Sequence, residues 1–213
     1  MIATVIGSTG LTGSFLVGRL LADSAITKVI SVSRRCLNLS NSKLIEMLVS
    51  DLADLPTIES KIRGVLYFCC LGTTIKAAGS KENFEKVDHA AIVDFAKIAK
   101  AHDAKSFTLV SAMGANANSM LFYNRVKGRT EDDIKAFELR SLIIFRPALL
   151  VGPRAGLRFG ERLLTNTIAP LSRLLPTRIQ NSFITKAETL ATRMLAAGKA
   201  APPGIQVILA KEI

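Results

Sequence analysis

The stretch MIATVIGSTGLTGSFLVGRLLAD, residues 1–23, decides the fold. An apolar run ends at Gly7, and apolar residues then recur at helical spacing through residues 11–21. Glycines stand three apart across the junction, at Gly7, Gly10 and Gly13. Glycine permits a sharp turn, a close approach of backbone to a phosphate, and tight packing of a helix on a strand. The stretch therefore predicts a strand, a phosphate-binding turn and a helix; a tight corner with no ligand is the alternative.

Strand and helix patterns alternate along the rest of the chain. Apolar and β-branched runs predict strands at residues 28–35, 45–52, 64–72, 106–115, 141–153 and 204–213. Helical spacing of apolar residues predicts helices at 53–62, 84–102, 121–139 and 185–198. This alternation predicts an α/β fold of Rossmann type, a doubly wound parallel sheet with helices on both faces. The length of 213 residues suits one domain, 1–213.

The chain is strongly basic, with 28 Lys and Arg against 17 Asp and Glu and a formal net charge of +11. Such an excess occurs in proteins that bind nucleic acid, membrane surfaces or anionic small molecules, and most often it marks a solvated basic surface. Aromatic residues make up 6% of the chain, tryptophan is absent, and no nucleic-acid-binding motif is recognisable. We therefore expect no nucleic-acid partner, whereas the charge alone does not decide between a membrane surface, an anionic small molecule and a solvated basic surface.

The sequence also bears on the compartment and on metal binding. No apolar run approaches the length of a bilayer-spanning helix, and the N-terminus lacks the basic and apolar regions of a signal peptide. Cys36, Cys69 and Cys70 have no disulfide or zinc spacing, and the only histidines, His89 and His102, have no third ligand in view. We expect a soluble cytoplasmic protein, a monomer or a homodimer, with no transmembrane segment and no metal site.

The end of the second predicted strand bears on the choice of nucleotide. NAD-selective sites of this fold place an Asp or Glu about twenty residues after the glycine turn, where it binds the ribose 2′-hydroxyl. Here the sequence reads VSRR, with Arg34 and Arg35 and no acid. A guanidinium binds a 2′-phosphate through charge-assisted hydrogen bonds, and neighbouring residues of an extended segment point to opposite sides. We expect Arg34 to contact NADP(H), with NAD(H) less favoured; two solvated arginines are the alternative.

A second group of residues indicates chemistry. Ser111 closes an apolar strand, and Tyr123 and Lys127 stand four apart on one face of the next predicted helix. A phenol exchanges protons poorly at neutral pH, and a nearby ammonium group favours its phenolate. These residues predict a site that moves a proton; a tyrosine that only packs on its helix is the alternative for Tyr123.

These residues resemble those of a known family, the short-chain dehydrogenase/reductases, in which a serine at the end of the fifth strand precedes a Tyr-x-x-x-Lys helix. The GxxGxxG pattern looks like the extended and atypical branches of that superfamily. Three segments are similar to the Tat-interacting-protein-like oxidoreductases, an atypical group: CCLGTTIKAAGSKENFEKVDHAAIVDFAKIAKAHDAKSFTLVSAMGAN, YNRVKG and FRPALLVGP. The resemblance runs from about residue 2 to about residue 192.

The resemblance implies a role for each matching position. The cofactor would lie along the strand ends. Its pyrophosphate would contact Gly7, Thr9, Gly10, Leu11 and Thr12, its 2′-phosphate Arg34 or Arg35, and its adenine Asp51 and Leu52. Its riboses would lie above Cys70, Leu71 and Gly72, and its nicotinamide amide would contact Pro147, Ala148 and Leu149. Ser111 would orient a substrate carbonyl, Tyr123 would give it a proton as NADPH delivers hydride, and Lys127 would hold the nicotinamide ribose. The implied partner is a small carbonyl compound or alcohol.

Two positions depart from the family's pattern. Asp88 stands where the superfamily often has an asparagine that holds a water, which puts a proton relay through that water in doubt. Ala112 follows Ser111 where relatives often carry a second serine, so Ser111 is the only hydroxyl there.

A basic segment near the C-terminus has no assigned role. It runs from residue 154 to 178 and carries one acid, Glu161, against Arg154, Arg158, Arg162, Arg173 and Arg178. In the proteins that the chain resembles, this region, about residues 150–186 here, forms a small C-terminal extension that covers the substrate pocket. In order of preference, the segment is a plain basic face, a lid over an anionic substrate, or a surface for a membrane or partner.

The sequence thus predicts an NADP(H)-dependent oxidoreductase of the atypical short-chain type, which reduces a carbonyl or oxidises an alcohol. The alternative is an NADPH-binding redox-sensing or regulatory protein with little turnover. A sensor needs the glycine turn and Arg34 but no phenol, so the combination of Ser111, Tyr123 and Lys127 favours the enzyme.

Overall fold

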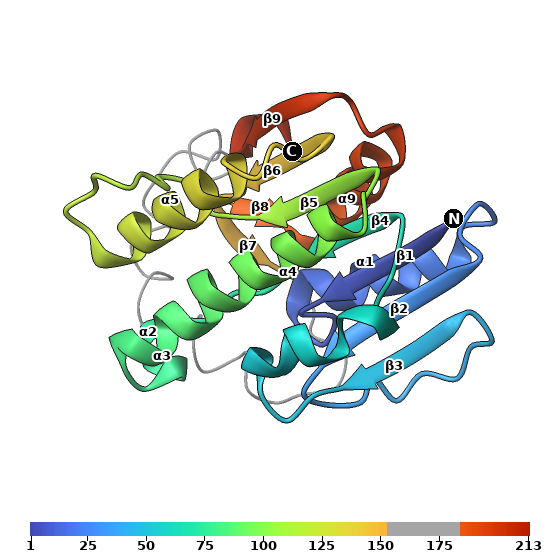
Figure 1. The fold of residues 1–213 in the computed structure, drawn as a ribbon. Coiled ribbons are helices and arrows are strands. Elements are labelled where there is room, and N and C mark those ends of the chain that lie inside the picture. Colours follow the sequence, from blue (N-terminus) through green and yellow to red (C-terminus); the bar gives the residue numbers. More distant parts are fainter. Residues whose placement is uncertain (153–183) are drawn as a thin grey trace.

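The structure, a computed structural model, describes residues 1–152 and 184–213. Seven parallel strands form the main sheet, in the order β3-β2-β1-β4-β5-β6-β9 (Figure 1). Their bounds are β1 Ile2–Ile6, β2 Lys28–Ser33, β3 Leu44–Leu48, β4 Leu66–Cys69, β5 Ser106–Val110, β6 Ser141–Arg146 and β9 Gly204–Leu209. The chain starts mid-sheet, runs outward to β3, and returns to pair β4 with the other side of β1. The strand order therefore reverses between β1 and β4, where open parallel sheets bind ligands.

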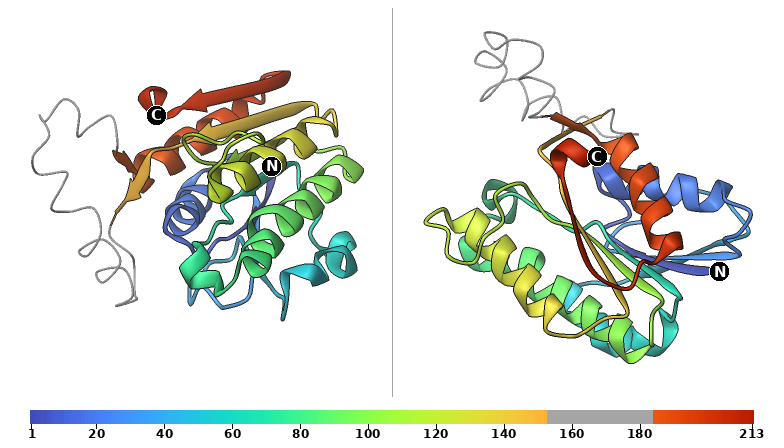
Figure 2. Two further views of the ribbon diagram at one scale, coloured as in Figure 1. Left: turned by 90° about the vertical axis from the view of Figure 1, so that its left-hand side faces the viewer. Right: turned by 90° about the horizontal axis from the view of Figure 1, so that it is seen from above.

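Helices cover both faces of this sheet, as the two views in Figure 2 show. α1 and α9 pack on one face, whereas η1, α4 and α5 pack on the other. The bounds are α1 Leu11–Ala22, η1 Leu52–Lys61, α2 Ile75–Ala78, α3 Lys81–Glu85, η2 Lys86–Ala90, α4 Ala91–Ala101, α5 Phe122–Lys135, α9 Ala187–Ala200 and η3 Ala210–Glu212. The predicted Rossmann-type fold is confirmed.

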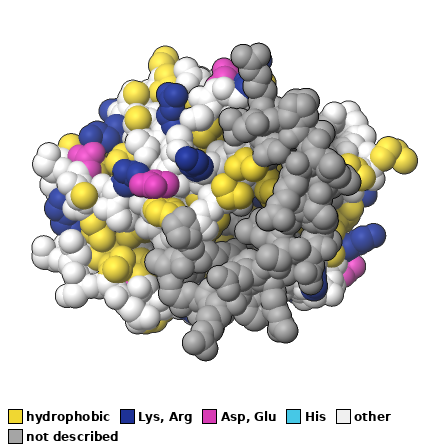
Figure 3. Space-filling view, turned by 180° about the vertical axis from the view of Figure 1, so that it is seen from behind, with side chains coloured by type: hydrophobic (Ala, Val, Ile, Leu, Met, Phe, Trp, Pro, Cys, Tyr) yellow, Lys and Arg dark blue, Asp and Glu magenta, His cyan; other side chains and the backbone are white. Residues whose placement is uncertain are grey.

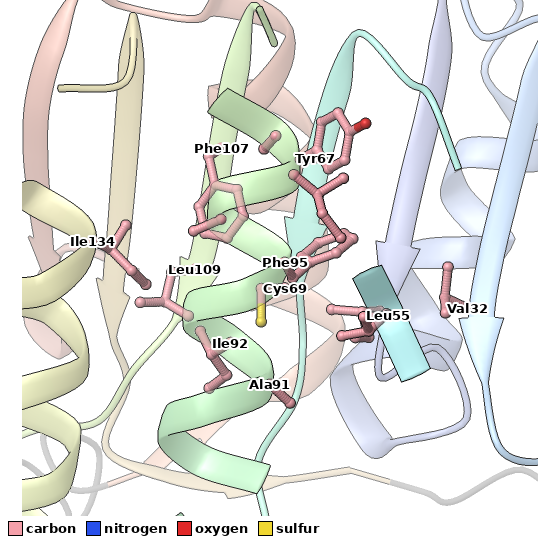
Figure 4. Close-up of a cluster of buried hydrophobic side chains, with 14 of the residues drawn as sticks. Val32, Leu55, Tyr67, Cys69, Ala91, Ile92, Phe95, Phe107, Leu109 and Ile134 are labelled. Carbon is pink, nitrogen blue, oxygen red and sulfur yellow. The ribbon is translucent and has the colours of Figure 1, made fainter. Parts of the chain in front are cut away.

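The larger of the two hydrophobic cores lies between the sheet and α4 (Figure 4). Its centre is a row of fully buried rings, in which Phe95 of α4 lies between Tyr67 of β4 and Phe107 of β5. The ring centroids of Phe95 lie 5.3 Å from Tyr67 and 5.8 Å from Phe107, and both pairs are tilted. Such packing fixes α4, and with it the segment that enters it, against the central strands.

That entering segment differs from the uniform helix predicted at 84–102. One π-helical turn, η2, separates α3 from α4 and contains Asp88, which is fully buried. The Thr73 backbone N–H donates to Asp88 Oδ2 at 2.9 Å, and the Thr130 hydroxyl donates to the Asp88 carbonyl at 2.8 Å. These bonds compensate for the wider turn, and π-turns inside α-helices are frequently found at functional sites.

A second difference lies after β6. The strand predicted at 141–153 is broken at Pro147, which has no N–H to continue the ladder. The chain resumes as β7, Leu149–Val151, which pairs in parallel with β8, Ile184–Lys186, in a small separate sheet. The helix predicted at 185–198 therefore begins two residues late, at Ala187. The basic segment 154–178 lies outside the described residues.

The back of the molecule shows how the basic charge is distributed (Figure 3). Lys and Arg side chains are scattered over the described part of this face and are not gathered in one patch. Within residues 1–152 and 184–213, no helix is both long and apolar enough to cross a bilayer. The same residues hold no group of three or more His, Cys, Asp and Glu that could bind a metal ion.

Candidate functional site

Five of the predicted site segments lie together at the carboxyl ends of the strands, because each of them directly follows a strand of the parallel sheet. Gly7 follows β1, Arg34 follows β2, Cys70 follows β4, Ser111 follows β5 and Pro147 follows β6. The strands are parallel and adjacent, so these ends lie side by side around the switch point between β1 and β4.

The three glycines of the turn meet different constraints. Gly7 has φ +76°, and a Cβ there would lie 2.6 Å from the Cys70 carbonyl carbon at the end of β4. A Cβ on Gly13 would overlap the Gly7 carbonyl oxygen. A Cβ on Gly10 would be 3.1 Å from that oxygen, and Gly10 is exposed. Gly7 and Gly13 therefore let strand, turn and helix pack, whereas Gly10 leaves space in front of the helix.

The N-terminus of α1 fits a phosphate. Gly10 is its N-cap, so no side chain caps it within the described part of the chain, and its first turn holds no acid. Thr12 Oγ1 is buried and finds no hydrogen-bond partner among the described residues. Thr9 and Leu11 are half-buried on either side of Gly10. Uncapped N–H groups and the helix dipole favour an anion, so these residues fit the pyrophosphate of a dinucleotide.

The residues predicted to select the nucleotide follow β2 and β3. Arg34 and Arg35 are exposed, and among the described residues neither guanidinium forms an ion pair. The Asp51 carboxylate accepts the Ala53 backbone N–H at 3.0 Å and caps η1, while Leu52 is buried in the core. Asp51 therefore has a structural task, and the adenine contact of this pair stays a prediction.

Lys127 and Asp88 form a buried ion pair beside Tyr123. The Lys127 ammonium lies 2.7 Å from Asp88 Oδ1, and the side chains are 4% and 0% exposed. Burial disfavours the charged lysine, but Asp88, together with the nearby Tyr123, outweighs it and raises the pKa of Lys127 above its usual value. Tyr123 lies one helical turn earlier on α5, with its ring tilted against Phe84 at 5.6 Å between centroids.

The chain after β4 runs across this pair. A Cβ on Gly72 would lie 3.7 Å from Asp88 Oδ1 and 3.8 Å from Lys127 Nζ. Cys70 and Leu71, which precede it, are half-buried next to Gly7. The predicted ribose-binding segment thus connects the glycine turn to the Lys127 side chain.

Ser111 is part of a network that the sequence did not suggest. Its hydroxyl lies 2.6 Å from Glu131 Oε1, and Glu131 is fully buried. Arg146 donates to both oxygens of the same carboxylate, from Nε at 3.0 Å and from a terminal nitrogen at 2.6 Å. The available signal was spacing, because Glu131 follows Tyr123 and Lys127 on α5 at intervals of four residues.

The predicted nicotinamide segment is fixed by backbone hydrogen bonds. The Pro147 carbonyl accepts the Met113 N–H at 2.9 Å, and the Ala148 N–H donates to the Thr185 hydroxyl of β8 at 3.1 Å. Leu149 is exposed. Thr185 is a further residue that sequence reasoning missed, since it stood inside a predicted helix.

The strand order, the glycine turn at its switch point and the uncapped helix define a protein of the NAD(P)-binding Rossmann class. The chain belongs to the NAD(P)H-binding family, whose model matches residues 7–170. It is 40% identical over 157 residues to FMP52-1 of Scheffersomyces stipitis, covering 72% of this chain and 69% of that protein. It is 33% identical over 163 residues to fmp52 of Emericella nidulans, covering 74% and 70%. The similarity to the Tat-interacting-protein-like group stays a prediction.

Two solved structures show the same fold at low sequence identity. MoeE5 in complex with UDP-glucose and NAD matches with a TM-score of 0.73 at 18% identity, over 98% of this chain and 75% of that one. WbmF of Bordetella bronchiseptica in complex with NAD⁺ matches with a TM-score of 0.74 at 14% identity, over 98% and 72%. These likenesses concern the fold alone.

The expectation of a cytoplasmic protein is wrong. The fungal FMP52 relatives are named as mitochondrial proteins, which points to mitochondria and away from the cytoplasm. The expectation rested on cysteines without disulfide spacing and on the lack of a secretory signal pattern, and neither observation distinguishes a mitochondrial protein from a cytoplasmic one.

Proposed function

We propose that this protein is an NADP(H)-dependent oxidoreductase that interconverts an alcohol and a carbonyl compound, with Tyr123 as the proton donor or acceptor. The observation that carries the proposal is the buried ion pair of Lys127 and Asp88, one helical turn from Tyr123. Burying two charges costs about as much as their attraction returns, so such a pair is a poor source of stability. A fixed ammonium group beside a phenol is better explained by proton transfer.

Each side chain has a defined task in this proposal. Lys127, held by Asp88, would place a positive charge beside Tyr123 and bind the hydroxyls of the nicotinamide ribose. Tyr123 gives its hydroxyl proton to the substrate oxygen in reduction and takes it back in oxidation. Ser111, which follows β5, contacts the substrate beside its reacting oxygen and so orients it towards Tyr123.

The cofactor is proposed to lie along the strand ends. The uncapped N-terminus of α1 supports a pyrophosphate there, and Arg34, or its neighbour Arg35, would bind the 2′-phosphate. The remaining contacts are proposed for Asp51 and Leu52 at the adenine, Cys70, Leu71 and Gly72 at the riboses, and Pro147, Ala148 and Leu149 at the nicotinamide amide. When bound, the nicotinamide exchanges a hydride with the substrate carbon.

A mitochondrial location is part of the proposal, in line with the names of the FMP52 relatives. The proposed substrate is a small molecule, and its oxygen must reach the Tyr123 hydroxyl.

One observation favours a second function, an NADPH-binding sensor with little turnover. The Ser111 hydroxyl is engaged by Glu131 at 2.6 Å, so its proton is directed away from a substrate carbonyl. Binding of the cofactor requires the glycine turn but not Ser111. The two functions therefore differ in turnover and not in affinity for NADPH.

Substitution of Tyr123 tests the choice. We expect Tyr123→Phe to lower turnover of aldehydes and ketones by NADPH about a hundredfold or more, while the dissociation constant for NADPH changes by less than about threefold. The other tyrosine, Tyr67, is a matched control. Its hydroxyl hydrogen-bonds to Ile62, Gly64 and His102, away from the carboxyl ends of the strands, so Tyr67→Phe should leave turnover intact. Equal rates for wild type and Tyr123→Phe would contradict the enzyme, and NADPH binding without any turnover would favour the sensor.

A further inference from the structure

Glu131 is the one fully buried carboxylate of α5, and the proposed mechanism gives it no task. It joins two strand ends, because it accepts from Ser111 after β5 and from Arg146 at the end of β6. Arg146 directly precedes the segment proposed for the nicotinamide. Glu131 is therefore placed to fix the orientation of the Ser111 hydroxyl and the position of Arg146, which precedes the proposed nicotinamide segment.

The hydrogen-bond geometry fixes the direction of the Ser111 hydroxyl. Arg146 donates to both carboxylate oxygens in a forked arrangement, and Lys135 Nζ lies 3.8 Å from Oε2. A guanidinium only donates, so both oxygens of the Glu131 carboxylate act as acceptors in this cluster. The single proton of the Ser111 hydroxyl must then lie on the 2.6 Å bond to Glu131. Towards the substrate, Ser111 presents only oxygen lone pairs.

We propose that Glu131 is a positioning residue that makes Ser111 a hydrogen-bond acceptor, so that the site takes substrates with a hydroxyl or N–H group on the carbon next to the reacting one. This inference rests on the proposed function. The reacting hydroxyl has a single proton, which must point to Tyr123 to be removed, so it cannot also bind Ser111. A second donor on the adjacent carbon satisfies Ser111. The substrate class is vicinal diols and amino alcohols, together with the hydroxy or amino ketones formed from them.

The charge on Arg146 stabilises the hydrogen bond between Ser111 and Glu131. Its side chain is a quarter exposed, and the hydrogen bonds and charge of Glu131 raise the pKa of Arg146, so the guanidinium stays charged. Ser111 itself is 5% exposed, so its hydroxyl has little contact with bulk water. A charged acceptor in a buried site is not given up for a neutral substrate carbonyl.

Glu131→Gln reverses the direction of the hydrogen bond with little change in shape. With the amide oxygen at the position of Oε2, it still accepts from the terminal nitrogen of Arg146; the amide N–H₂ then takes the position of Oε1, donates to Ser111 and loses the bond from Arg146 Nε. The Ser111 proton is released towards the substrate. Ser111→Ala is the matched variant, because it removes the hydroxyl and leaves the ion pair of Glu131 and Arg146 intact.

The test compares two probes, trans-cyclohexane-1,2-diol and 2-methoxycyclohexanol, whose second oxygen does or does not carry a proton. Dissociation constants are measured by ligand-observed NMR on the full chain loaded with NADP⁺, in a Tyr123→Phe background that prevents turnover. With Ser111 and Glu131 intact, we expect the diol to bind about tenfold more tightly than the ether. The ratio should fall to about one with Ser111→Ala and below that with Glu131→Gln. A ratio that Ser111→Ala does not change overturns the proposal.

A neutron structure of the wild-type chain decides the same point without a probe. A deuteron on Ser111 Oγ directed at Glu131 supports the proposal, and a deuteron on Glu131, or directed away from it, overturns the proposal. This measurement also serves if Glu131→Gln does not fold. Failure of the proposed function is distinct, since NADP⁺ would then oxidise no diol while the diol-to-ether ratio still depended on Ser111.

Discussion

The glycine turn and the α5 site lie at the same edge of the sheet, but opposite means hold them in place. The turn depends on the absence of side chains, because a Cβ on Gly7 or Gly13 would overlap the backbone of the turn or of the segment that follows β4. The α5 site depends on charged side chains that are buried, with Lys127 bound to Asp88 and Glu131 bound to Arg146.

The difference predicts how each region fails. A site made from backbone tolerates no added atom, since the protein interior is close-packed. A site made from buried charges tolerates no missing partner, since the remaining charge loses its compensation. Substitutions that add a methyl group or remove one charge therefore separate the two regions.

The largest expected effect is loss of the buried ammonium group. Lys127→Met leaves Asp88 charged and buried, and it should lower the free energy of unfolding by about 3–5 kcal/mol. Urea unfolding followed by circular dichroism measures the loss. Adding Asp88→Asn neutralises the orphaned charge and should restore most of the stability; additive losses in the double variant would contradict the pairing.

The same pair has a defined pH dependence. Folding raises the pKa of Lys127 above its ordinary value of 10.5, so its contribution to stability is complete below that value. The contribution is lost as the pH rises through the folded value. Wild type should therefore lose stability in alkali more steeply than the Lys127→Met variant does.

The next effect belongs to the glycine turn. Gly13→Ala places a methyl group against the Gly7 carbonyl oxygen, so strand and helix must separate, and we expect a loss of about 3 kcal/mol. Gly18→Ala is the control in the same helix, because nothing lies within 4 Å of a Cβ there. That substitution should stabilise the protein by up to about 1 kcal/mol. Equal unfolding midpoints for the two variants would refute the close packing at Gly13.

The same comparison explains how much the sequence could predict. The glycine turn and the parallel sheet follow from local patterns, since glycine spacing and runs of apolar residues report the backbone around them. Ser111, Tyr123 and Lys127 could be selected by their spacing, and their proposed roles stay predictions. What could not be predicted is the partner of each side chain, because that depends on which strand end meets which helix face.

Asp88 and Pro147 show why local patterns fail at these points. The π-turn at Asp88 adds a residue to one helical turn, and the apolar spacing of 84–102 conceals it because α3 and α4 keep their own apolar faces. Pro147 breaks a continuous apolar run, so one predicted strand becomes β6 and β7. Glu131 lies in a charged run, TEDD, and a charged run carries no local signal that one of its members is buried.

The smallest expected effect on stability belongs to Arg34, at the exposed end of the proposed cofactor site. Arg34 and Arg35 are both exposed and form no ion pair within the described residues, so neither holds the fold, and Arg34→Ala should leave the unfolding midpoint unchanged. A lost charge-assisted contact to the 2′-phosphate should weaken NADPH binding about ten- to a hundredfold and leave NADH binding unchanged. Arg35→Ala is the matched control, because it removes the neighbouring exposed guanidinium in the bend that follows β2. If only Arg35→Ala weakened NADPH binding, the contact with the 2′-phosphate would belong to Arg35. Equal affinities of the wild type for NADPH and NADH would show that neither arginine recognises that phosphate. The exposed arginine therefore separates recognition of the nucleotide from the packing that Gly7 and Gly13 maintain.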